Sequence, residues 1–132
     1  MSERKELIDL IALGESQNRE FKQDFDTESV RKKVLKTAIA FANTAGGKIL
    51  IGIEDQTLKI VGISPERLPH IVEDISNAIS DGCTPYIPHT INLVQMGDKT
   101  IVELDIYPGN DTPYYLKSKT PETGTFVRLK LP

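Results

Sequence analysis

Apolar residues recur along the chain at two different spacings, and the wider spacing predicts three helices. Residues three or four apart lie on one face of a helix, so this pattern is typical of helices that bury one side. The helices are expected over about 3–13, 28–43 and 64–82. Ser64 and Pro65 provide a start for the third helix, and Pro69 lies early enough to kink it rather than end it.

Shorter apolar runs predict strands between and after the helices. Strands are expected around 20–22, over 49–53 and 59–63, as a pair within 90–108, and as a second hairpin over 113–130. Gly97-Asp98 supplies the turn of the first hairpin, and PETG at 121–124 is the loop of the second. The run at 49–53 is nearly all apolar, which is typical of a central strand buried on both faces.

This order of elements predicts an α+β domain, in which a mixed, largely antiparallel sheet packs against about three helices. No repeat, low-complexity tract or Pro/Gly-rich linker divides residues 1–132, so we expect a single domain. Hydrophobic residues make up 39% and charged residues 27% of the chain, a globular rather than a disordered composition. No apolar run is long enough to span a bilayer, so no membrane partner is expected.

The net charge of −3 argues against a surface that binds polyanions everywhere, but the charge is unevenly distributed. Residues 61–111 carry two basic and eight acidic groups, a net charge of −6, whereas residues 112–132 carry four basic groups and one acidic group, a net charge of +3. This pattern is compatible with a local positive face that binds phosphates and equally with an uneven surface that has no partner.

Glu15, Glu20 and Asp55 are candidates for a shared acidic site. Asp55 follows the central apolar strand, and functional polar groups favour the ends of such strands. Three converging carboxylates would bind Mg²⁺ or Mn²⁺, and such a metal would activate water at a phosphorus centre. Lys22 lies two residues after Glu20, so a strand places both side chains on one face. The alternative interpretation is a set of solvated surface charges.

The segment AFANTAGGKILIGIED at 40–55 is a candidate phosphate contact. Asn43 ends a helix, and Gly46-Gly47 leave backbone N–H groups that a phosphate would approach closely. The segment lacks the Walker pattern, in which glycines precede a helix, and the nearby helix end has the wrong dipole sign for a phosphate. The alternative is a glycine that ends the helix, followed by a tight turn.

Two basic clusters form a third candidate, a nucleic-acid contact. They comprise Arg31, Lys32, Lys33 and Lys36 on the second helix, and Lys117, Lys119, Arg128 and Lys130 near the C-terminus, where Tyr114 and Tyr115 adjoin them. Basic groups bind phosphates, and interleaved aromatic rings stack on bases. The alternative is a solvated helix face and an edge hairpin that its lysines protect from aggregation.

The remaining candidates are single residues. His70 and His89 have no Cys or His partner at metal-ligand spacing, and the one cysteine, Cys83, has no evident activating base. A single cysteine also excludes an internal disulfide. Together with the absence of a signal peptide, it predicts a cytoplasmic location.

Three stretches together carry a family resemblance: GESQNREFK at 14–22, AFANTAGGKILIGIED at 40–55 and the closing PYYLKSKTPETGTFVRLK at 113–130. On these motifs the chain resembles the Schlafen AlbA-type domain, also known as a divergent AAA or DNA-binding domain family, over about residues 12–130. The resemblance implies an α+β fold and nucleic-acid binding, with DNA as the expected ligand, in bacterial transcriptional regulators and helicase-related proteins. It also implies a following ATPase-like or winged-helix region, so we expect an N-terminal fragment of a longer protein.

The resemblance implies two alternative functions. Some animal members of the Schlafen group are endoribonucleases that use three acidic residues, and the matching positions here are Glu15, Glu20 and Asp55. Those nucleases carry a zinc site that this chain has too few Cys and His residues to form. They also build their groove from two lobes, so a single copy would need a second protomer in a homodimer. The family's ATPase label implies ATP binding as a third function, after nucleic-acid binding and RNA cleavage.

Overall fold

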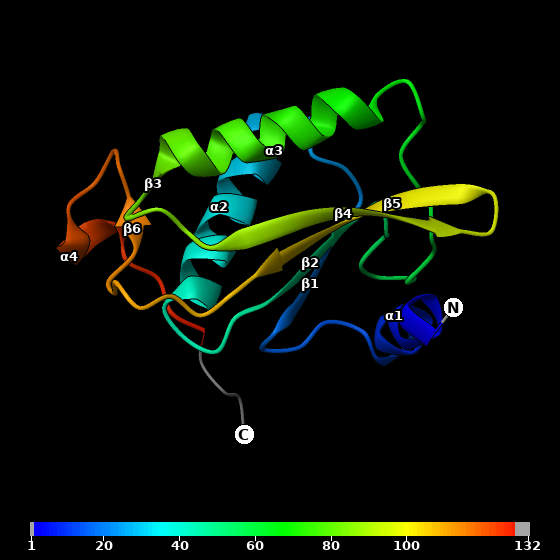
Figure 1. Cartoon of the computed structure of the whole chain (residues 1–132), viewed down its shortest axis with the longest axis horizontal. Coiled ribbons are helices and arrows are strands. Elements are labelled where there is room, and N and C mark those ends of the chain that lie inside the picture. Colours follow the sequence, from blue (N-terminus) through cyan, green and yellow to red (C-terminus); the bar gives the residue numbers. More distant parts are fainter. Residues whose placement is uncertain (1, 129–132) are drawn as a thin grey trace.

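The computed structural model describes residues 2–128 and has an open sheet with helices on both faces (Figure 1). The helices are α1 Ser2–Leu13, α2 Glu28–Ala42, α3 Leu68–Gly82 and the short α4 Pro121–Gly124. The strands are β1 Arg19–Lys22, β2 Gly47–Ile51, β3 Cys83–Thr84, β4 His89–Met96, β5 Lys99–Ile106 and β6 Tyr115–Leu116. They form a four-stranded sheet in the order β1-β2-β5-β4 and a two-stranded sheet of β3 and β6.

The main sheet is mixed but largely antiparallel, which confirms the predicted α+β class. β1 runs parallel to β2, whereas β5 runs antiparallel to both β2 and β4. Ile49, Leu50 and Ile51 of the central strand β2 are fully buried, as the continuous apolar run predicted. The hairpin of β4 and β5 turns at Gly97-Asp98, where Gly97 has a φ of 67° that favours glycine.

Each face of the sheet has its own core, because successive residues of a strand point to opposite faces. Ile49 and Ile51 belong to the larger core, which α2 and α3 cover. Leu50 packs with Leu7 and Ile11 of α1 on the other face. Figure 1 shows α2 and α3 on one side of the sheet and α1 on the other. The sheet is therefore the middle layer, and the single helix α1 forms the third layer.

Helix α2 matches the predicted second helix, and its apolar second half enters the core. Thr27 caps its N-terminus, since the hydroxyl oxygen accepts a hydrogen bond of 3.2 Å from the N–H of Val30. All residues from 38 to 42 are buried. Beyond the helix, Gly46 has a φ of 78°, and its N–H donates to the carbonyl of Phe41 at 2.8 Å. This glycine therefore ends the helix in the usual way.

The strand predicted over 59–63 is wrong. Within the described chain this segment forms only one isolated bridge, between Ile53 and Ile60. The N–H groups of Val61 and Gly62 both turn to the carbonyl of Gly52, each at 2.9 Å, which is incompatible with a regular ladder. The apolar residues of this segment are typical of a strand, but its backbone hydrogen bonds to Gly52 make it part of a loop.

The third helix begins later than predicted, at Leu68 rather than at Ser64. The residues between them form a turn, in which the N–H of Arg67 donates to the carbonyl of Ser64 at 3.0 Å. Pro69 thereby lies in the first turn of α3, where no intrahelical N–H is needed, so the predicted kink does not arise. The end of the helix at Gly82 agrees with the prediction.

The second hairpin predicted over 113–130 is reduced, among the described residues, to a single antiparallel bridge, between Tyr115 and Thr125. β6 pairs with β3, with Leu116 opposite Cys83, and the PETG segment forms α4 instead of a hairpin loop. Thr120 caps this short helix, and its backbone N–H donates to the hydroxyl of Thr123 at 3.2 Å. Tyr115 thus pairs with Thr84 of β3 on one side and with Thr125 on the other. Lys130 lies outside the described residues.

The side chain of Asn43 attaches the C-terminal segment to the end of α2. Its amide nitrogen donates hydrogen bonds of 2.9 Å to the carbonyls of Tyr114 and Phe126. Its side-chain oxygen accepts a hydrogen bond of 2.7 Å from the N–H of Tyr114. These bonds span 71 and 83 residues of sequence, so one side chain holds two distant backbone segments in place.

We expect Asn43→Ala to lower the free energy of unfolding by about 2–4 kcal/mol, because three hydrogen bonds are lost and their backbone partners are left unpaired. Urea unfolding followed by circular dichroism measures the change. Asn77→Ala, at an exposed position of α3, is the matched control and should not destabilise the protein. A cost at Asn43 below about 1 kcal/mol would contradict this structural role.

Asp24 and Arg67 form a bidentate ion pair between the segment after β1 and the start of α3. Arg67 donates from Nη1 to Oδ2 of Asp24 at 2.9 Å and from Nη2 to Oδ1 at 2.7 Å. These hydrogen bonds hold the pKa of Asp24 below its ordinary value, against the opposing effect of burial. The pair therefore stabilises the fold as long as Asp24 is ionised.

This stabilisation depends on pH. A carboxyl whose pKa falls on folding contributes stability above its unfolded pKa of 3.8, and loses that contribution as the pH falls through the lower folded pKa. We expect Asp24→Asn to cost about 1 kcal/mol at about pH 7 and almost nothing at about pH 2. Urea unfolding at both pH values measures the difference, with Asp9→Asn at an exposed position of α1 as the control. An equal cost at the two pH values would contradict the assignment.

Candidate functional site

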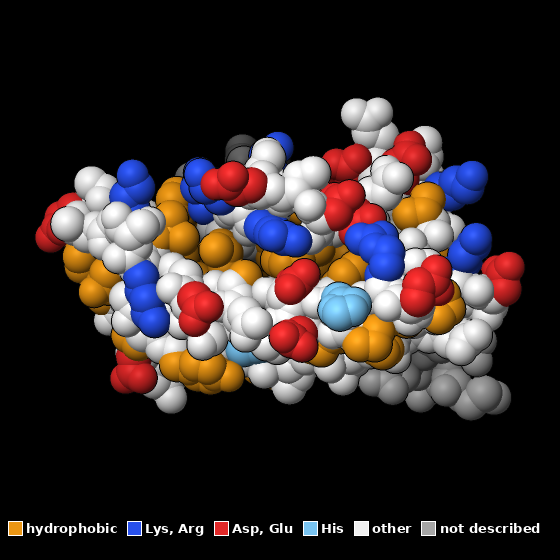
Figure 2. Space-filling model, turned by 90° about the horizontal axis from the view of Figure 1, so that it is seen from above, with side chains coloured by type: hydrophobic (Ala, Val, Ile, Leu, Met, Phe, Trp, Pro, Cys, Tyr) orange, Lys and Arg blue, Asp and Glu red, His pale blue; other side chains and the backbone are white. Residues whose placement is uncertain are grey.

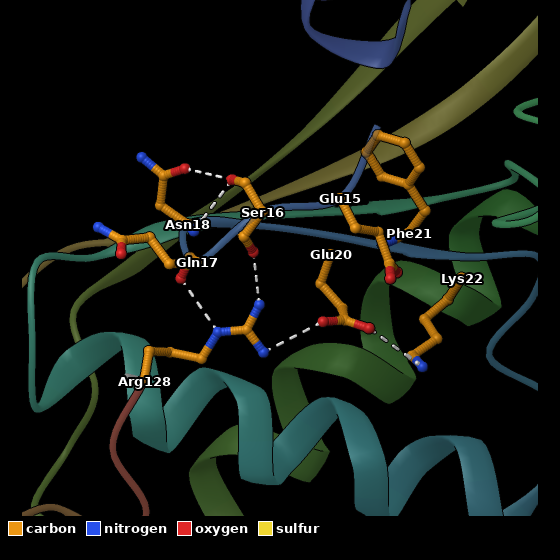
Figure 3. A network of polar contacts seen from close by, with 8 residues as sticks. All are labelled: Glu15, Ser16, Gln17, Asn18, Glu20, Phe21, Lys22 and Arg128. Atoms are coloured by element: carbon orange, nitrogen blue, oxygen red, sulfur yellow. Dashed lines mark hydrogen bonds and ion pairs between the residues drawn. The ribbon is translucent and has the colours of Figure 1, made fainter. Parts of the chain in front are cut away.

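The GESQNREFK motif folds back on itself before β1 (Figure 3). The backbones of Ser16 and Arg19 exchange hydrogen bonds of 3.1 and 3.3 Å, which closes a tight turn. The Glu15 carboxylate accepts a hydrogen bond of 2.9 Å from the N–H of Phe21. The turn therefore brings Glu15 alongside β1, the strand that carries Glu20.

Arg128 reaches this turn from the C-terminal segment and uses three of its nitrogens to hold it. Nε donates to the carbonyl of Gln17 at 3.0 Å, and Nη2 donates to the carbonyl of Ser16 at 2.7 Å. Nη1 donates to the Glu20 carboxylate at 3.2 Å, as Figure 3 shows. The guanidinium carbon also lies 5.1 Å from the centre of the Phe41 ring, within cation–π range. Arg128, which was predicted to bind nucleic acid, is thus engaged within the protein.

Glu20 and Lys22 lie on the same face of β1, as their spacing predicted. The Lys22 ammonium is 3.5 Å from the second oxygen of Glu20, and the two side chains are only 18% and 15% exposed. Each oxygen of Glu20 therefore faces a cation, Arg128 on one side and Lys22 on the other. A catalytic role for this pair stays a prediction.

Glu20 and Asp55 both lie close enough to Glu15 for their charges to act on it. Burial raises the pKa of Glu15, the hydrogen bond from Phe21 lowers it, and Glu20 and Asp55 raise it again, so that it lies above its ordinary value. Within residues 2–128, however, no three His, Cys, Asp or Glu side chains are grouped tightly enough to hold a metal ion. The oxygen donors suit Mg²⁺ or Mn²⁺, but their present placement is not a coordination sphere. The metal site stays a prediction.

Lysines from two distant parts of the sequence line one groove, which we name the lysine groove. Its volume is about 520 Å³, and its lysines are Lys32 and Lys36 of α2 with Lys117 and Lys119 after β6. Leu35 and Leu116 also line it, together with one acidic residue, Asp81. Figure 2 shows Lys and Arg side chains at this end of the molecule (left), with hydrophobic side chains among them. The groove therefore combines positive charge with apolar surface.

The four lysines differ in how firmly they are held. Lys117 donates from Nζ to the carbonyl of Ser80 at 2.9 Å, and Nζ of Lys36 lies 5.6 Å from the centre of the Phe126 ring. Lys32 lies 3.6 Å from Glu28, but both side chains are largely exposed, so this ion pair is weak. Lys32 and the exposed Lys119 are therefore the lysines most available to a ligand.

Three other residues predicted to bind nucleic acid do not line the lysine groove. Arg31 donates to the carbonyl of Phe25 at 3.2 Å and lies 3.6 Å from Asp74. Lys33 is exposed on α2, outside the lining of the groove. Tyr114 is only 1% exposed, so its ring is not free to stack on a base in this conformation.

Asn43, Gly46 and Gly47 have structural roles that account for their presence. Asn43 holds the C-terminal segment, as described above. A side chain at Gly46 would meet the carbonyl of Ile106 at 2.7 Å, and one at Gly47 would meet the Phe41 ring at 2.7 Å. Close packing therefore explains both glycines, in line with the alternative interpretation of this segment. A phosphate contact here stays a prediction.

The sequence contained no local signal for two features of this region. Arg128 lies 108 residues after Glu20, and nothing in the intervening pattern pairs the two. Leu35 and Leu116, which line the groove between its lysines, look like ordinary core residues in the sequence. Both features depend on the path of the C-terminal segment, which no local pattern in the sequence specifies.

In the part of the chain that the structure describes, the remaining candidates, Cys83, His70 and His89, lack the contacts of a catalytic residue. Burial raises the pKa of the Cys83 thiol to about 12, so it stays protonated and unreactive at neutral pH. Nδ1 of His89 lies 2.8 Å from the carbonyl of Ile87, and His70 is exposed on α3. Across residues 2–128, no helix has both the length and the apolar character needed to cross a membrane.

Comparison with known sequences supports the family resemblance that the three motifs indicated. The profile of the Schlafen, AlbA_2 family matches residues 15–130. An uncharacterized ATP-binding protein of Ureaplasma parvum serovar 3 is 31% identical over 83 residues, which are 62% of this chain and 23% of that protein. The chain thus spans about a quarter of the length of this curated relative.

Solved structures also share the fold. The solution structure of the N-terminal domain of a Nitrosomonas europaea protein, whose name relates it to the ATP-dependent DNA helicase RecG, has a TM-score of 0.65 and 26% identity, and the match covers 96% of this chain and 87% of that one. A crystal structure of a Corynebacterium diphtheriae protein has a TM-score of 0.58 at 15% identity, covering 89% and 25% of the two chains. The family profile covers most of the described chain and confirms the resemblance carried by the three motifs. The chain therefore belongs to the Schlafen, AlbA_2 family.

Proposed function

We propose that this domain binds nucleic acid, and DNA in the first place, through the lysine groove. The observation that carries the proposal is the convergence of two basic clusters, from α2 and from the segment after β6, on one groove. Clustered lysines bind nucleic acid because they neutralise phosphates and release the counterions condensed on them. The relationship of the N. europaea protein to a DNA helicase, expressed in its name, favours DNA over RNA.

The kind of residue in the groove indicates how the ligand is recognised. Lysine is a flexible point charge that contacts phosphates, and it does not by itself read base edges. Leu35 and Leu116 offer apolar surface beside these charges, which suits contact with sugars. Arg128, Asn43 and Tyr114 are engaged inside the protein, so the proposed interface does not include them. We therefore propose binding with little sequence preference.

The double variant Lys32→Gln/Lys119→Gln tests this interface, because both side chains are exposed and their loss removes two positive charges from the groove. We expect duplex DNA to bind about tenfold more weakly, and the slope of log affinity against log salt to fall by about 2. Fluorescence anisotropy with a labelled duplex, repeated over a range of salt concentrations, measures both quantities. The same titration with RNA compares the two ligand classes.

The matched control is Lys5→Gln/Lys59→Gln, which makes the same charge change at exposed positions of α1 and of the loop after β2. It should change the affinity little, because those lysines do not line the groove. An equal loss of affinity in both double variants would assign the binding to net charge rather than to the groove. Absence of binding to DNA and RNA at low salt would refute the proposed function.

A metal-dependent endoribonuclease is the second candidate, which is supported by the placement of Glu20 and Asp55 near enough to Glu15 to act on its charge. Carboxylates are the ligands that Mg²⁺ and Mn²⁺ prefer. Lys22, already beside Glu20, would neutralise charge at a phosphate. Arg128 would compete with a metal for Glu20, because it holds one oxygen of that carboxylate in this structure.

If this site cleaves RNA, Mn²⁺-dependent cleavage of a structured RNA should fall by about 100-fold or more in Glu20→Gln, since one metal ligand is lost. Gel analysis of end-labelled RNA measures the rate. Glu54→Gln, next to Asp55 but outside the proposed ligand set, is the matched control and should cleave like the parent protein. Equal cleavage by the parent and by Glu20→Gln would rule out this site.

A further inference from the structure

Strand β4 is an edge of the main sheet and lacks the features that usually protect an edge. The order β1-β2-β5-β4 leaves β4 with one strand partner among the described residues. All eight of its residues pair with β5 in one continuous register, so no bulge twists the edge away. Its sequence, HTINLVQM, contains no proline, lysine, arginine, aspartate or glutamate. Edges of this length and regularity are templates for pairing with another strand.

The opposite edge of the same sheet makes the contrast clear. β1 has only four residues, and three of them, Arg19, Glu20 and Lys22, are charged. A short and charged strand is a usual device against pairing with other chains. The sheet has two further acidic residues, Glu103 and Asp105, but they lie on the interior strand β5 and not on β4. The absence of charge is therefore specific to the β4 edge.

The uncharged region is longer than β4 itself. Residues 82–97 contain no Asp, Glu, Lys or Arg, and this is the longest such run in a chain in which 27% of residues are charged. The run includes the loop that enters β4 and the first residue of its turn. A surface without charge gives a charged ligand such as nucleic acid nothing to bind, but it allows two identical surfaces to meet without repulsion.

Exposed apolar side chains border this edge. Leu93, on β4, is 52% exposed, and Tyr86, in the loop before β4, is 67% exposed. The Tyr86 ring lies against His89, with the ring centres 5.7 Å apart. Tyr107 is 45% exposed, and its hydroxyl lies 3.0 Å from that of Thr90. Burial of such side chains would add hydrophobic stabilisation to the backbone hydrogen bonds of a new strand pair.

We propose that β4 pairs antiparallel with β4 of a second copy of this chain, about a two-fold axis near the middle of the strand. Two four-stranded sheets would then join into one continuous sheet. A strand is complementary to itself in this arrangement, because each outward N–H of one copy meets an outward C=O of the other. The neutral edge removes the like-charge repulsion that self-association of a charged strand would incur. The axis brings Leu93 of the two copies together.

Sedimentation equilibrium of the 132-residue chain tests the proposal. The wild-type chain should form a dimer, and Leu93→Lys should raise the dimer dissociation constant by about tenfold or more, because two lysines would meet at the axis. Leu93 is half exposed, so this variant should keep the fold, which thermal unfolding by circular dichroism checks. Leu13→Lys, at a position of α1 that is 69% exposed, is the matched control and should dimerise like the wild type.

A second measurement on the wild-type chain does not depend on any variant. Hydrogen–deuterium exchange at low and high protein concentration should show β4 amides that become protected as the dimer forms, while amides of the β1 edge do not change. A chain that stays monomeric at every concentration would overturn the proposal, and would leave the edge for an extended segment of another protein. A dimer whose β4 amides exchange like those of the monomer, or that Leu93→Lys does not weaken, would also overturn it.

Discussion

The carboxamide of Asn43 is the interaction on which the rest of this domain depends. It lies at the end of α2 and forms hydrogen bonds with the backbone at Tyr114 and at Phe126. Both ends of the segment that contains β6 and α4 are thereby tied to one helix. An amide suits this task, because it offers two donors and an acceptor at one point.

The positions of two candidate functional regions follow from that attachment. Between the tied residues, Lys117 and Lys119 lie opposite the lysines of α2, which creates the lysine groove. Just beyond them, Arg128 reaches the turn before β1 and binds Glu20. One polar side chain thus positions both the basic surface proposed to bind phosphates and the cation that faces the candidate acidic site.

The two glutamates of the GESQNREFK motif also make structural contacts in the folded chain. Glu15 accepts a backbone N–H, and both oxygens of Glu20 face cations. These contacts stabilise the turn and the short strand β1, so the motif has a structural role whether or not it has a catalytic one. Burial is the main cause that raises the pKa of Glu15, and the nearby Glu20 and Asp55 raise it further.

The success of the predictions varied with the range of the interactions involved. α2 formed where expected and β2 formed two residues earlier than expected, because helical spacing and a continuous apolar run are local properties. The strand expected over 59–63 failed because two of its N–H groups bind the single carbonyl of Gly52. Of the hairpin over 113–130 only the bridge between Tyr115 and Thr125 formed within the described residues, and the pairing of β6 with the distant strand β3 was not predicted, because the hydrophobic pattern does not specify which strands pair.

The sequence by itself therefore determined the class of fold, the position of the main helices and the central strand, and the family, since each has a signal within a short stretch. It also placed Glu20 and Lys22 on one face of a strand. Only the tertiary structure decided that Arg128 meets Glu20 and that two lysine clusters share a groove. These contacts join residues far apart in the chain, and they arise only when the hydrophobic cores and Asn43 have brought the C-terminal segment onto α2.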